Sequence, residues 1–413
     1  MEQAKNLSMV NKKSRGLKNS YPYKKEINIF VAYTYIIVAI VMAILLPNEY
    51  LKTLLFYSAI ILLAVLFAAL AQNCKTSFFF NIFLGASFIV LFFTLGFRNY
   101  SGIDDPAYIS IFNQVSEYGW WTVFKETTME PGYLILNNLV AFFSNNYLHI
   151  QLITSFLPLS IFYYGFKKYR NMISIPMAVF LLCTMLYFQV LSVALIRMFI
   201  AISIVFVAFY YIPKQRTRRY ITLILIASMF HYSALIMIVL AYFSINKVNL
   251  SKKARRFVFI GFVSTPILFI LVAKFLVPIM GDRYSVYGTI NNLSFSISSF
   301  DTIPLLILLL LFYKKFKDED KYYFKLFISI FALSCIMSFY SGMVSFGRLI
   351  FYSNSAFFIA ASMVQKVLSR DSKKVLFSGA IVLFGFVYLY WTQFTLESHI
   401  QNLFPYQNIF FTI

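Results

Sequence analysis

Two short polar stretches bring together side chains that could bind an anion and move a proton. The first runs from Arg98 to Tyr108, and the second begins at Glu130. A guanidinium offers planar, bidentate donors to phosphate or carboxylate, and a nearby carboxylate can accept a hydroxyl proton. The combination suits an anionic substrate that carries sugar hydroxyls. The residues concerned are Arg98, Asp104, Asp105, Tyr108, Glu130 and Tyr133.

The same residues also permit a purely structural interpretation. Arg98 could pair with Asp104 to hold the loop in shape, while Gly102 and Pro106 form a turn. Glu130 could cap the helix that follows it. Both interpretations stay open at this point, and they differ in whether the charged groups face a substrate or each other.

Two further polar residues lie within apolar segments. Arg197 comes early in an apolar run, where a cation costs a few kcal/mol unless it is paired, hydrated or extended to the membrane surface. We expect it to bind substrate, and the alternative is an interfacial anchor. His231 could carry a proton or donate to phosphate, because imidazole titrates near neutrality. Its alternative is an ordinary packing role.

Two more arginines are expected near the same face of the protein. Arg348 begins a late apolar run, and Arg283 lies in a polar segment that follows another run. Together with Arg98 and Arg197 they could neutralise a diphosphate without a metal. Each could instead be an interfacial anchor, and this alternative is strongest for Arg283.

The amino-acid composition indicates that these residues belong to a membrane protein. Hydrophobic residues make up 60% of the 413 positions, mean hydropathy is +0.75, and aromatic residues reach 20%. Soluble domains contain about 45–50% apolar residues. Apolar runs of about twenty residues, each sufficient to cross about 30 Å of hydrocarbon, recur along the chain. We predict an all-α, polytopic membrane protein with about eleven transmembrane helices.

The predicted spans follow from these runs, and the polar segments define the rest of the chain. A basic tail over residues 1–26 is expected in the cytoplasm, followed by a transmembrane domain over 27–391. Long outer loops are expected at 98–131 and 281–302, and an outer tail at 392–413. The spans are 27–46, 51–71, 78–97, 148–166, 175–191, 192–212, 257–277, 303–316, 324–341, 349–365 and 375–391.

Two apolar segments are ambiguous, and the positive-inside rule decides how they are interpreted. If residues 132–143 crossed the membrane, the following basic residues Lys167, Lys168 and Arg170 would lie outside. We therefore predict an outer-face or re-entrant helix there. The segment 220–243 separates two basic clusters that both favour the cytoplasm, so it is expected to fold back as two half-helices that break near His231.

The formal net charge of +21 does not indicate nucleic-acid binding, because Lys and Arg cluster between the apolar runs as they do in cytoplasmic loops. The chain has no phosphate-binding glycine loop, no paired zinc ligands, and no loop with the several carboxylates that divalent cations favour. Its three cysteines, Cys74, Cys183 and Cys335, lie far apart. We predict neither a metal nor any other cofactor.

These motifs, taken in order, resemble the EpsG family of bacterial exopolysaccharide proteins, which are related in function to Wzy-type repeat-unit polymerases. The resemblance covers most of the chain, although Met198 stands where Gln is expected after the arginine, and Asn99 where an aromatic residue is common. The matching residues are Arg98, Gly102, Asp104, Tyr108, Glu130 to Tyr133, Arg197, Ala201, Phe230, His231, Ser233, Gly347, Arg348, Pro405 and Tyr406.

The resemblance implies a polymerase that joins oligosaccharide repeat units carried on undecaprenyl diphosphate, at the outer face of the bacterial cytoplasmic membrane. Arg98, Arg197 and Arg348 would hold the diphosphate, and Asp104, Glu130 or His231 would take the acceptor proton. The product would be a capsule, an O-antigen or a free exopolysaccharide. A chain-length regulator and a flippase of the same pathway are the implied partners.

Two other functions fit a polytopic protein of this kind. A flippase or exporter of the same lipid-linked sugar would carry charged residues along a path through the middle of the bilayer. Here the charges gather at the ends of the spans, which favours a one-sided site. An acyltransferase or a ligase acting on surface polysaccharide would also place His or Arg at the outer face, and His231 alone is slight support for it.

Overall fold

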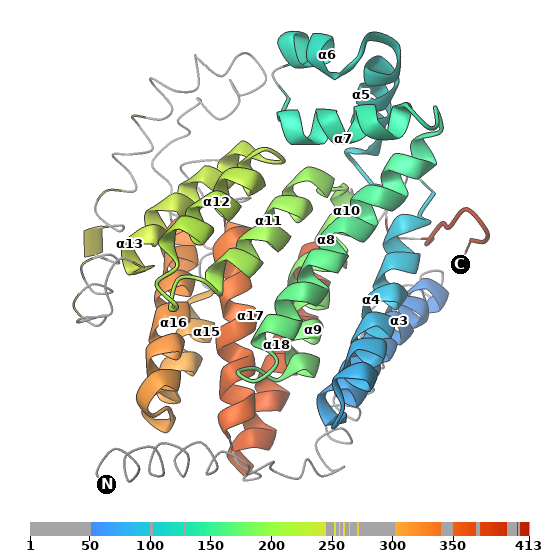
Figure 1. Ribbon diagram of the computed structural model, residues 1–413. Coiled ribbons are helices and arrows are strands. Elements are labelled where there is room, and N and C mark those ends of the chain that lie inside the picture. The colour runs from blue at the N-terminus through green and yellow to red at the C-terminus, as the bar shows by residue number, and fades with distance from the viewer. Residues whose placement is uncertain are drawn as a thin grey trace, which may run out of the picture.

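The structure is a computed structural model, and it describes residues 51–99, 102–127, 129–244, 302–339, 350–368, 372–394 and 405–412, with isolated positions between them. Within these residues the regular elements are helices (Figure 1). The predicted spans at 27–46 and 257–277 and the residues Arg283 and Arg348 lie outside the described residues.

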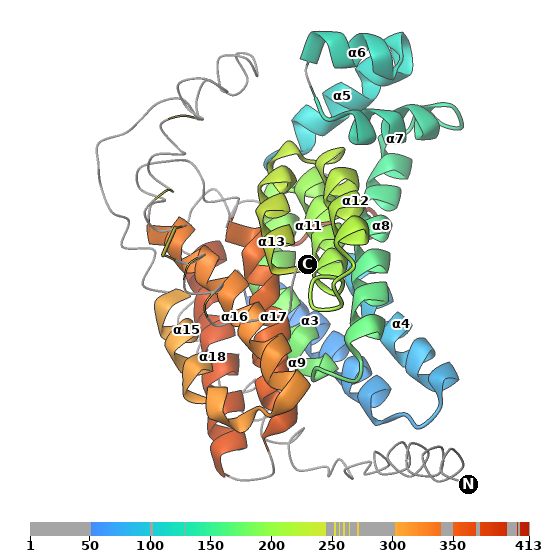
Figure 2. The ribbon, with the colours of Figure 1, turned by 60° about the vertical axis from the view of Figure 1, so that its left-hand side comes forward.

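The helices of the described residues form a bundle with a cap at one end (Figures 1 and 2). In chain order they are α3 (Leu51–Asn73), α4 (Ser77–Gly96), α5 (Asp105–Tyr118), α6 (Trp120–Thr127), α7 (Pro131–Ala141), α8 (Tyr147–Tyr169), α9 (Ile175–Leu182), the π-helix η2 (Cys183–Tyr187), α10 (Phe188–Val193), α11 (Ile196–Phe209), α12 (Thr217–Ser228), the 3-10 helix η3 (Tyr232–Leu240), α13 (Ala241–Ser244), α15 (Thr302–Leu311), the 3-10 helix η8 (Tyr313–Lys315), α16 (Asp318–Phe339), α17 (Ile350–Val367) and α18 (Ser372–Phe394).

Five helices of the described residues are long and apolar enough to cross a membrane, so the chain is a helical membrane protein, but the predicted count of about eleven spans is not supported. Helix α11, with 14 residues, and α15, with 10, are shorter than a usual span. Helices α8 and α17 have the length but not the hydropathy of the other five. The five are Lys52–Asn73, Ser77–Gly96, Ile175–Val193, Glu319–Ser338 and Ser372–Leu389.

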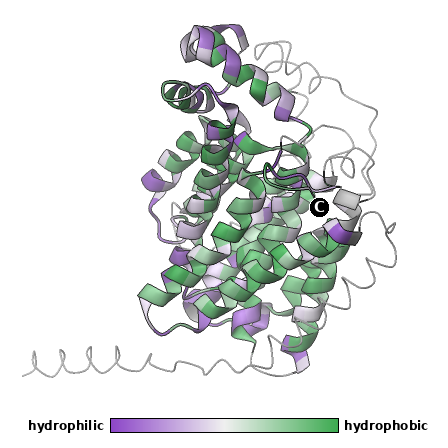
Figure 3. Ribbon diagram, turned by 90° about the vertical axis from the view of Figure 1, so that its right-hand side faces the viewer, coloured by the Kyte–Doolittle hydropathy of each residue, from purple (hydrophilic) through white to green (hydrophobic). Residues whose placement is uncertain are grey.

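Burial separates central helices from peripheral ones. The apolar window of Ile175–Val193 is 89% buried within the protein, whereas that of Lys52–Asn73 is only 39% buried. Helix α3 thus leaves leucines such as Leu55 and Leu70 exposed, as a lipid-facing helix would. Helix α17 is buried from Tyr352 to Gln365, so its polar residues face other helices. Hydrophobic residues dominate the bundle, and hydrophilic ones gather at its ends (Figure 3).

The cap consists of α5, α6 and α7, at the top of Figures 1 and 2. The sequence predicts a long loop over 98–131, and the structure shows that most of this segment is helical. Helix α7 runs across the ends of the long helices instead of along them (Figure 1), which agrees with the prediction that residues 132–143 do not cross. Pro106 and Pro131 lie in the first turns of α5 and α7, where proline suits a helix.

The ambiguous segment 220–243 folds back on itself, as predicted. Helix α12 ends at Ser228, the chain reverses over residues 229–231, and η3 returns beside α12. Two contacts join the arms: the Tyr220 hydroxyl donates to the Met237 carbonyl at 2.5 Å, and the hydroxyls of Thr217 and Ser244 lie 2.8 Å apart. The reversal places His231 at the tip of the hairpin.

Candidate functional site

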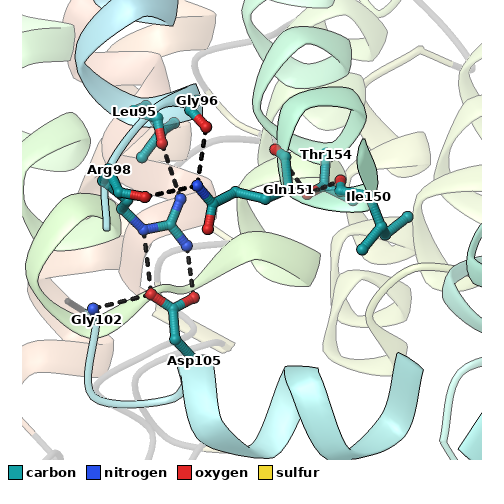
Figure 4. A network of polar contacts seen from close by, with 8 residues as sticks. All are labelled: Leu95, Gly96, Arg98, Gly102, Asp105, Ile150, Gln151 and Thr154. Atoms are coloured by element: carbon teal, nitrogen blue, oxygen red, sulfur yellow. Dashed lines mark hydrogen bonds and ion pairs between the residues drawn. The ribbon is translucent and has the colours of Figure 1, made fainter. Parts of the chain in front are cut away.

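The first arginine–carboxylate pair lies directly after α4. The Arg98 guanidinium donates to Asp105 twice, with Nε 3.2 Å from Oδ2 and Nη2 2.6 Å from Oδ1 (Figure 4). Its Nη1 donates to the Leu95 carbonyl at 2.9 Å, and Asp105 Oδ2 also accepts from the Gly102 N–H at 2.9 Å. Both side chains are 0% exposed. The buried pair therefore stabilises the turn between α4 and α5.

Two other segments hold this turn in place. From α8, Gln151 Nε2 donates to the carbonyls of Gly96 and Arg98, each at 2.8 Å (Figure 4). From the C-terminal tail, the Gln407 carbonyl accepts from the Asn99 N–H at 2.9 Å, and the Ile409 N–H donates to the Phe97 carbonyl at 3.0 Å. The backbone around Arg98 is thus bonded to segments far away in the sequence.

The pairing corrects one detail of the structural alternative. Arg98 pairs with Asp105 and not with Asp104, because α5 begins at Asp105 and turns this carboxylate inward. Burial on its own would lower the pKa of Arg98, but the Asp105 charge more than offsets this, so the pKa lies above its usual value. The geometry favours a structural role for Arg98, and its predicted contact with substrate stays a prediction.

The turn that carries this pair docks on a break in a central helix. Between α10 and α11 the chain adopts a left-handed conformation at Ala194, with φ 59°. The N–H groups of Ile103 and Asp104 donate to the carbonyls of Ser192 and Val193, at 3.1 Å and 3.0 Å. Backbone groups that a helix break would leave unpaired are thus satisfied by the cap.

Gly102 makes this close approach possible. A Cβ atom at this position would lie 2.5 Å from Ala194 Cβ, far inside normal contact, and 3.0 Å from Asp105 Oδ2, tighter than an ordinary contact. The break also begins a new helix at Ile196, which places Arg197 in the first turn of α11. Arg197, early in its apolar run, thus lies at the start of a buried apolar helix.

Arg197 makes the second arginine–carboxylate pair, with Glu130. Arg197 Nη1 donates to Glu130 Oε2, and Arg197 Nε donates to the Tyr108 hydroxyl at 3.4 Å. The guanidinium also lies 5.6 Å from the centre of the Tyr108 ring, which in turn packs edge-on to Tyr133 with 5.5 Å between ring centres. Side-chain exposure is 10% for Arg197 and 1% for Glu130.

Helix α5 serves both pairs. Asp105 and Tyr108 are three residues apart, so they lie on the same face of the helix. One binds Arg98 and the other contacts Arg197. Glu130 occupies the position before α7 but makes no capping hydrogen bond there, so the alternative role as a helix cap is wrong for its side chain.

The His231 hairpin meets the second pair through α7 and α17. The Gly132 N–H donates to the Met229 carbonyl at 2.8 Å, which joins the start of α7 to the hairpin tip. Ser233 Oγ lies 2.7 Å from His231 Nδ1 and 3.1 Å from the hydroxyl of Tyr352 on α17. Tyr352 is fully buried, so this contact lies in the interior of the protein.

The structure therefore gathers five of the predicted site residues and adds two others. Ser233 and Tyr352 were not assigned a role, and nothing in the sequence distinguishes Tyr352 from the other 29 tyrosines. Asp104 lies at the start of α5, half-buried beside the helix break. Among the described residues, no group of three or more His, Cys, Asp or Glu side chains could hold a metal ion. The gathered residues are Tyr108, Glu130, Tyr133, Arg197 and His231.

A bundle of apolar helices with a polar cap and buried ion pairs at one end defines a polytopic membrane protein with a charged site at the end of its bundle. The model of the EpsG family matches residues 81–408, which include every described residue of this site. The chain belongs to the EpsG family and is a membrane protein of polysaccharide biosynthesis. No curated protein and no solved structure matches it.

Proposed function

We propose that this protein is a metal-independent glycosyltransferase that polymerises oligosaccharide repeat units carried on undecaprenyl diphosphate. The reaction would take place at the outer face of the bacterial cytoplasmic membrane and extend a capsule, O-antigen or exopolysaccharide chain. Membership of the EpsG family supports this class of function. A flippase and a chain-length regulator of the same pathway would be its partners, one supplying the repeat units and the other limiting the product.

One observation carries the proposal: the Arg197–Glu130 pair lies at a helix break and contacts Tyr108, which packs against Tyr133. A guanidinium has five N–H donors, and Glu130 and Tyr108 accept from two of its nitrogens. A diphosphate could bind the remaining donors or compete with Glu130 for the same ones, because both are oxyanions. Arg197 is the more accessible of the two paired arginines, which suits a group that must meet a substrate.

The chemistry follows from this arrangement. A hydroxyl of the acceptor unit attacks the anomeric carbon of the growing chain, a new C–O bond forms, and the bond from that carbon to the diphosphate oxygen breaks. Arg197 would stabilise the charge that develops on the leaving diphosphate. Glu130 or His231 would take the proton of the attacking hydroxyl, with Asp104 as a third candidate. A single displacement would invert the anomeric carbon.

Tyr108 and Tyr133 would provide apolar faces with hydroxyls for sugar rings at the same place. Arg348 and Arg283, outside the described residues, stay proposed as further ligands of the diphosphate. A lipid-linked substrate would reach this end of the bundle sideways from the bilayer, since its polyprenyl chain stays in the hydrocarbon.

The test compares lipid-linked and surface glycans in cells that lack the protein and are complemented with wild type or Arg197→Ala. We expect single repeat units on the lipid carrier without the protein or with Arg197→Ala, and long chains with wild type. Arg219→Ala is the matched control, because this arginine lies over Tyr211 in a basic cluster away from the site. Units trapped on the inner leaflet would indicate a flippase instead, and long chains with altered decoration would indicate an acyltransferase.

A further inference from the structure

We propose that Ser233 and Tyr352 are positioning residues, which hold the ring of His231 in the orientation and protonation pattern that the site requires. The inference rests on the proposed function and assigns two residues of the same site. The carrying geometry is a chain of three polar groups from three places in the sequence: the hairpin tip, the start of η3, and α17.

Ser233 is the centre of this chain. Its Oγ lies within hydrogen-bond distance of both His231 Nδ1, at 2.7 Å, and Tyr352 Oη, at 3.1 Å. A serine hydroxyl has one proton and two acceptor sites, so it can satisfy both neighbours at once. The two ring nitrogens of histidine are distinct, and the bond that one makes determines the tautomer and fixes where the other lies.

Tyr352 extends this chain of polar groups from the hairpin to a second helix. Its side chain is fully buried in α17, where a hydroxyl without a partner would destabilise the fold. Meeting Ser233 ties the hairpin tip to a central helix. The same hairpin tip bonds to the start of α7, where the Gly132 N–H donates to the Met229 carbonyl two residues after Glu130, so His231 is held near the group that we expect to meet the diphosphate.

A packing role and a positioning role predict different outcomes, because positioning acts only through the imidazole. Ser233→Ala and Tyr352→Phe remove single hydroxyls, whereas Ser233→Thr keeps one. The matched controls remove hydroxyls whose hydrogen bonds within the described part of the chain go to backbone carbonyls: Ser228→Ala, next to the hairpin tip, and Tyr169→Phe, at the end of α8. All are measured as the rate of chain extension in membranes supplied with lipid-linked repeat units, with protein level as a second readout.

We expect Ser233→Ala and Tyr352→Phe to lower the rate about tenfold at unchanged protein level, and Ser233→Thr to recover most of it. The controls should stay within about twofold of wild type. In a His231→Ala background, adding Ser233→Ala or Tyr352→Phe should lower the rate no further, because the ring that they position is gone.

Equal rate losses in the presence and absence of His231 would overturn the inference, and so would rates like wild type in both variants. Either result leaves the polymerase proposal intact if Arg197→Ala still abolishes chain extension. If wild-type membranes extend no chains and the deletion strain makes long polymer, the proposed function fails, and the inference fails with it.

Discussion

The two arginine–carboxylate pairs have the same chemistry but different surroundings. Arg98 and Asp105 are both 0% exposed, and the two side chains also bond to the backbone of Leu95 and Gly102. Arg197 is 10% exposed, and its further neighbour is a tyrosine side chain. The first pair is bonded to its own turn on several sides, whereas the second can exchange a partner for a ligand.

The difference shows how the same kind of ion pair can support the fold at one place and be available to a ligand at another. A buried ion pair recovers its desolvation cost only with good geometry and further hydrogen bonds, which Arg98 has. Arg197 lacks backbone partners of this kind among its described contacts, so a diphosphate could replace its present ones. Helix α5 connects the two, because Asp105 and Tyr108 share a face.

Replacing both members of each pair by apolar residues should separate the two roles most strongly. Arg98→Met with Asp105→Leu removes two buried charges together, so it should cost less than the loss of one charge alone, although the Leu95 carbonyl and the Gly102 N–H each lose a partner. Arg197→Met with Glu130→Leu breaks no backbone hydrogen bond among the described contacts and should keep the protein level. It should nevertheless lower the rate of chain extension about a thousandfold, because the charge facing the diphosphate is lost. Chain length on polyacrylamide gels and protein level in membranes give the two readouts.

If the Arg197→Met, Glu130→Leu variant extends chains normally, the second pair is structural too, and the two pairs do not differ in role. If the Arg98→Met, Asp105→Leu variant is well expressed but inactive, Arg98 contacts substrate after all. The matched design matters because each variant loses one positive and one negative charge, so net charge is the same in both.

Breaking the first pair at one end should damage folding. Asp105→Asn leaves the Arg98 charge buried at 0% exposure without a counterion, which costs about 3–5 kcal/mol. We expect a large drop in the amount of detergent-soluble, monodisperse protein. Asp104→Asn is the control from the adjacent position, since this side chain is half-buried and not the one that pairs with Arg98.

An equal loss of protein in Asp104→Asn and Asp105→Asn would contradict the assignment of the pair. Thermal unfolding in detergent measures the difference. A variant Asp105→Glu should lie between the two, because it keeps the charge but lengthens a fully buried side chain.

The close approach of the cap to the helix break should tolerate no extra atom. Gly102→Ala places a Cβ 2.5 Å from that of Ala194, so the turn must move away, at a cost of about 1–3 kcal/mol. The movement would also disturb Asp105, which binds the Gly102 N–H. The control is Gly85→Ala in α4, which has nothing within 4 Å of its Cβ and should be neutral or slightly stabilising. Comparable unfolding temperatures for both variants would show that the contact between Gly102 and Ala194 leaves room for a methyl group.

Much of this architecture could be predicted from charge and hydropathy. The reversal near His231 followed from two basic clusters that a single crossing cannot place on one side, and the structure folds back over residues 229–231. Arg197 and Glu130 stood out as charges beside apolar runs. Their pairing could not be predicted, because it depends on how α7 lies across the ends of α8 and α11.

Two features could not be predicted, for physical reasons. Asp104 and Asp105 have the same chemistry, and only the start of α5 decides which carboxylate turns inward. The break at Ala194 lies in a continuous apolar stretch, where no Gly or Pro marks the end of α10. The cap supplies the hydrogen bonds that permit this break, and a tertiary contact of this kind leaves no local pattern.

The smallest effect should come from Tyr108, the residue of α5 that contacts the second pair. Tyr108→Phe removes the hydroxyl that accepts from Arg197 but keeps the ring that packs on Tyr133. At 3.4 Å this hydrogen bond is long, so its loss should slow chain extension only about threefold to tenfold and leave protein level unchanged. Tyr108→Leu, which also removes the ring, should cost more. A rate loss in Tyr108→Phe as large as that in Arg197→Ala would mean that the hydroxyl contacts substrate itself, and α5 would then supply a reacting group as well as a support.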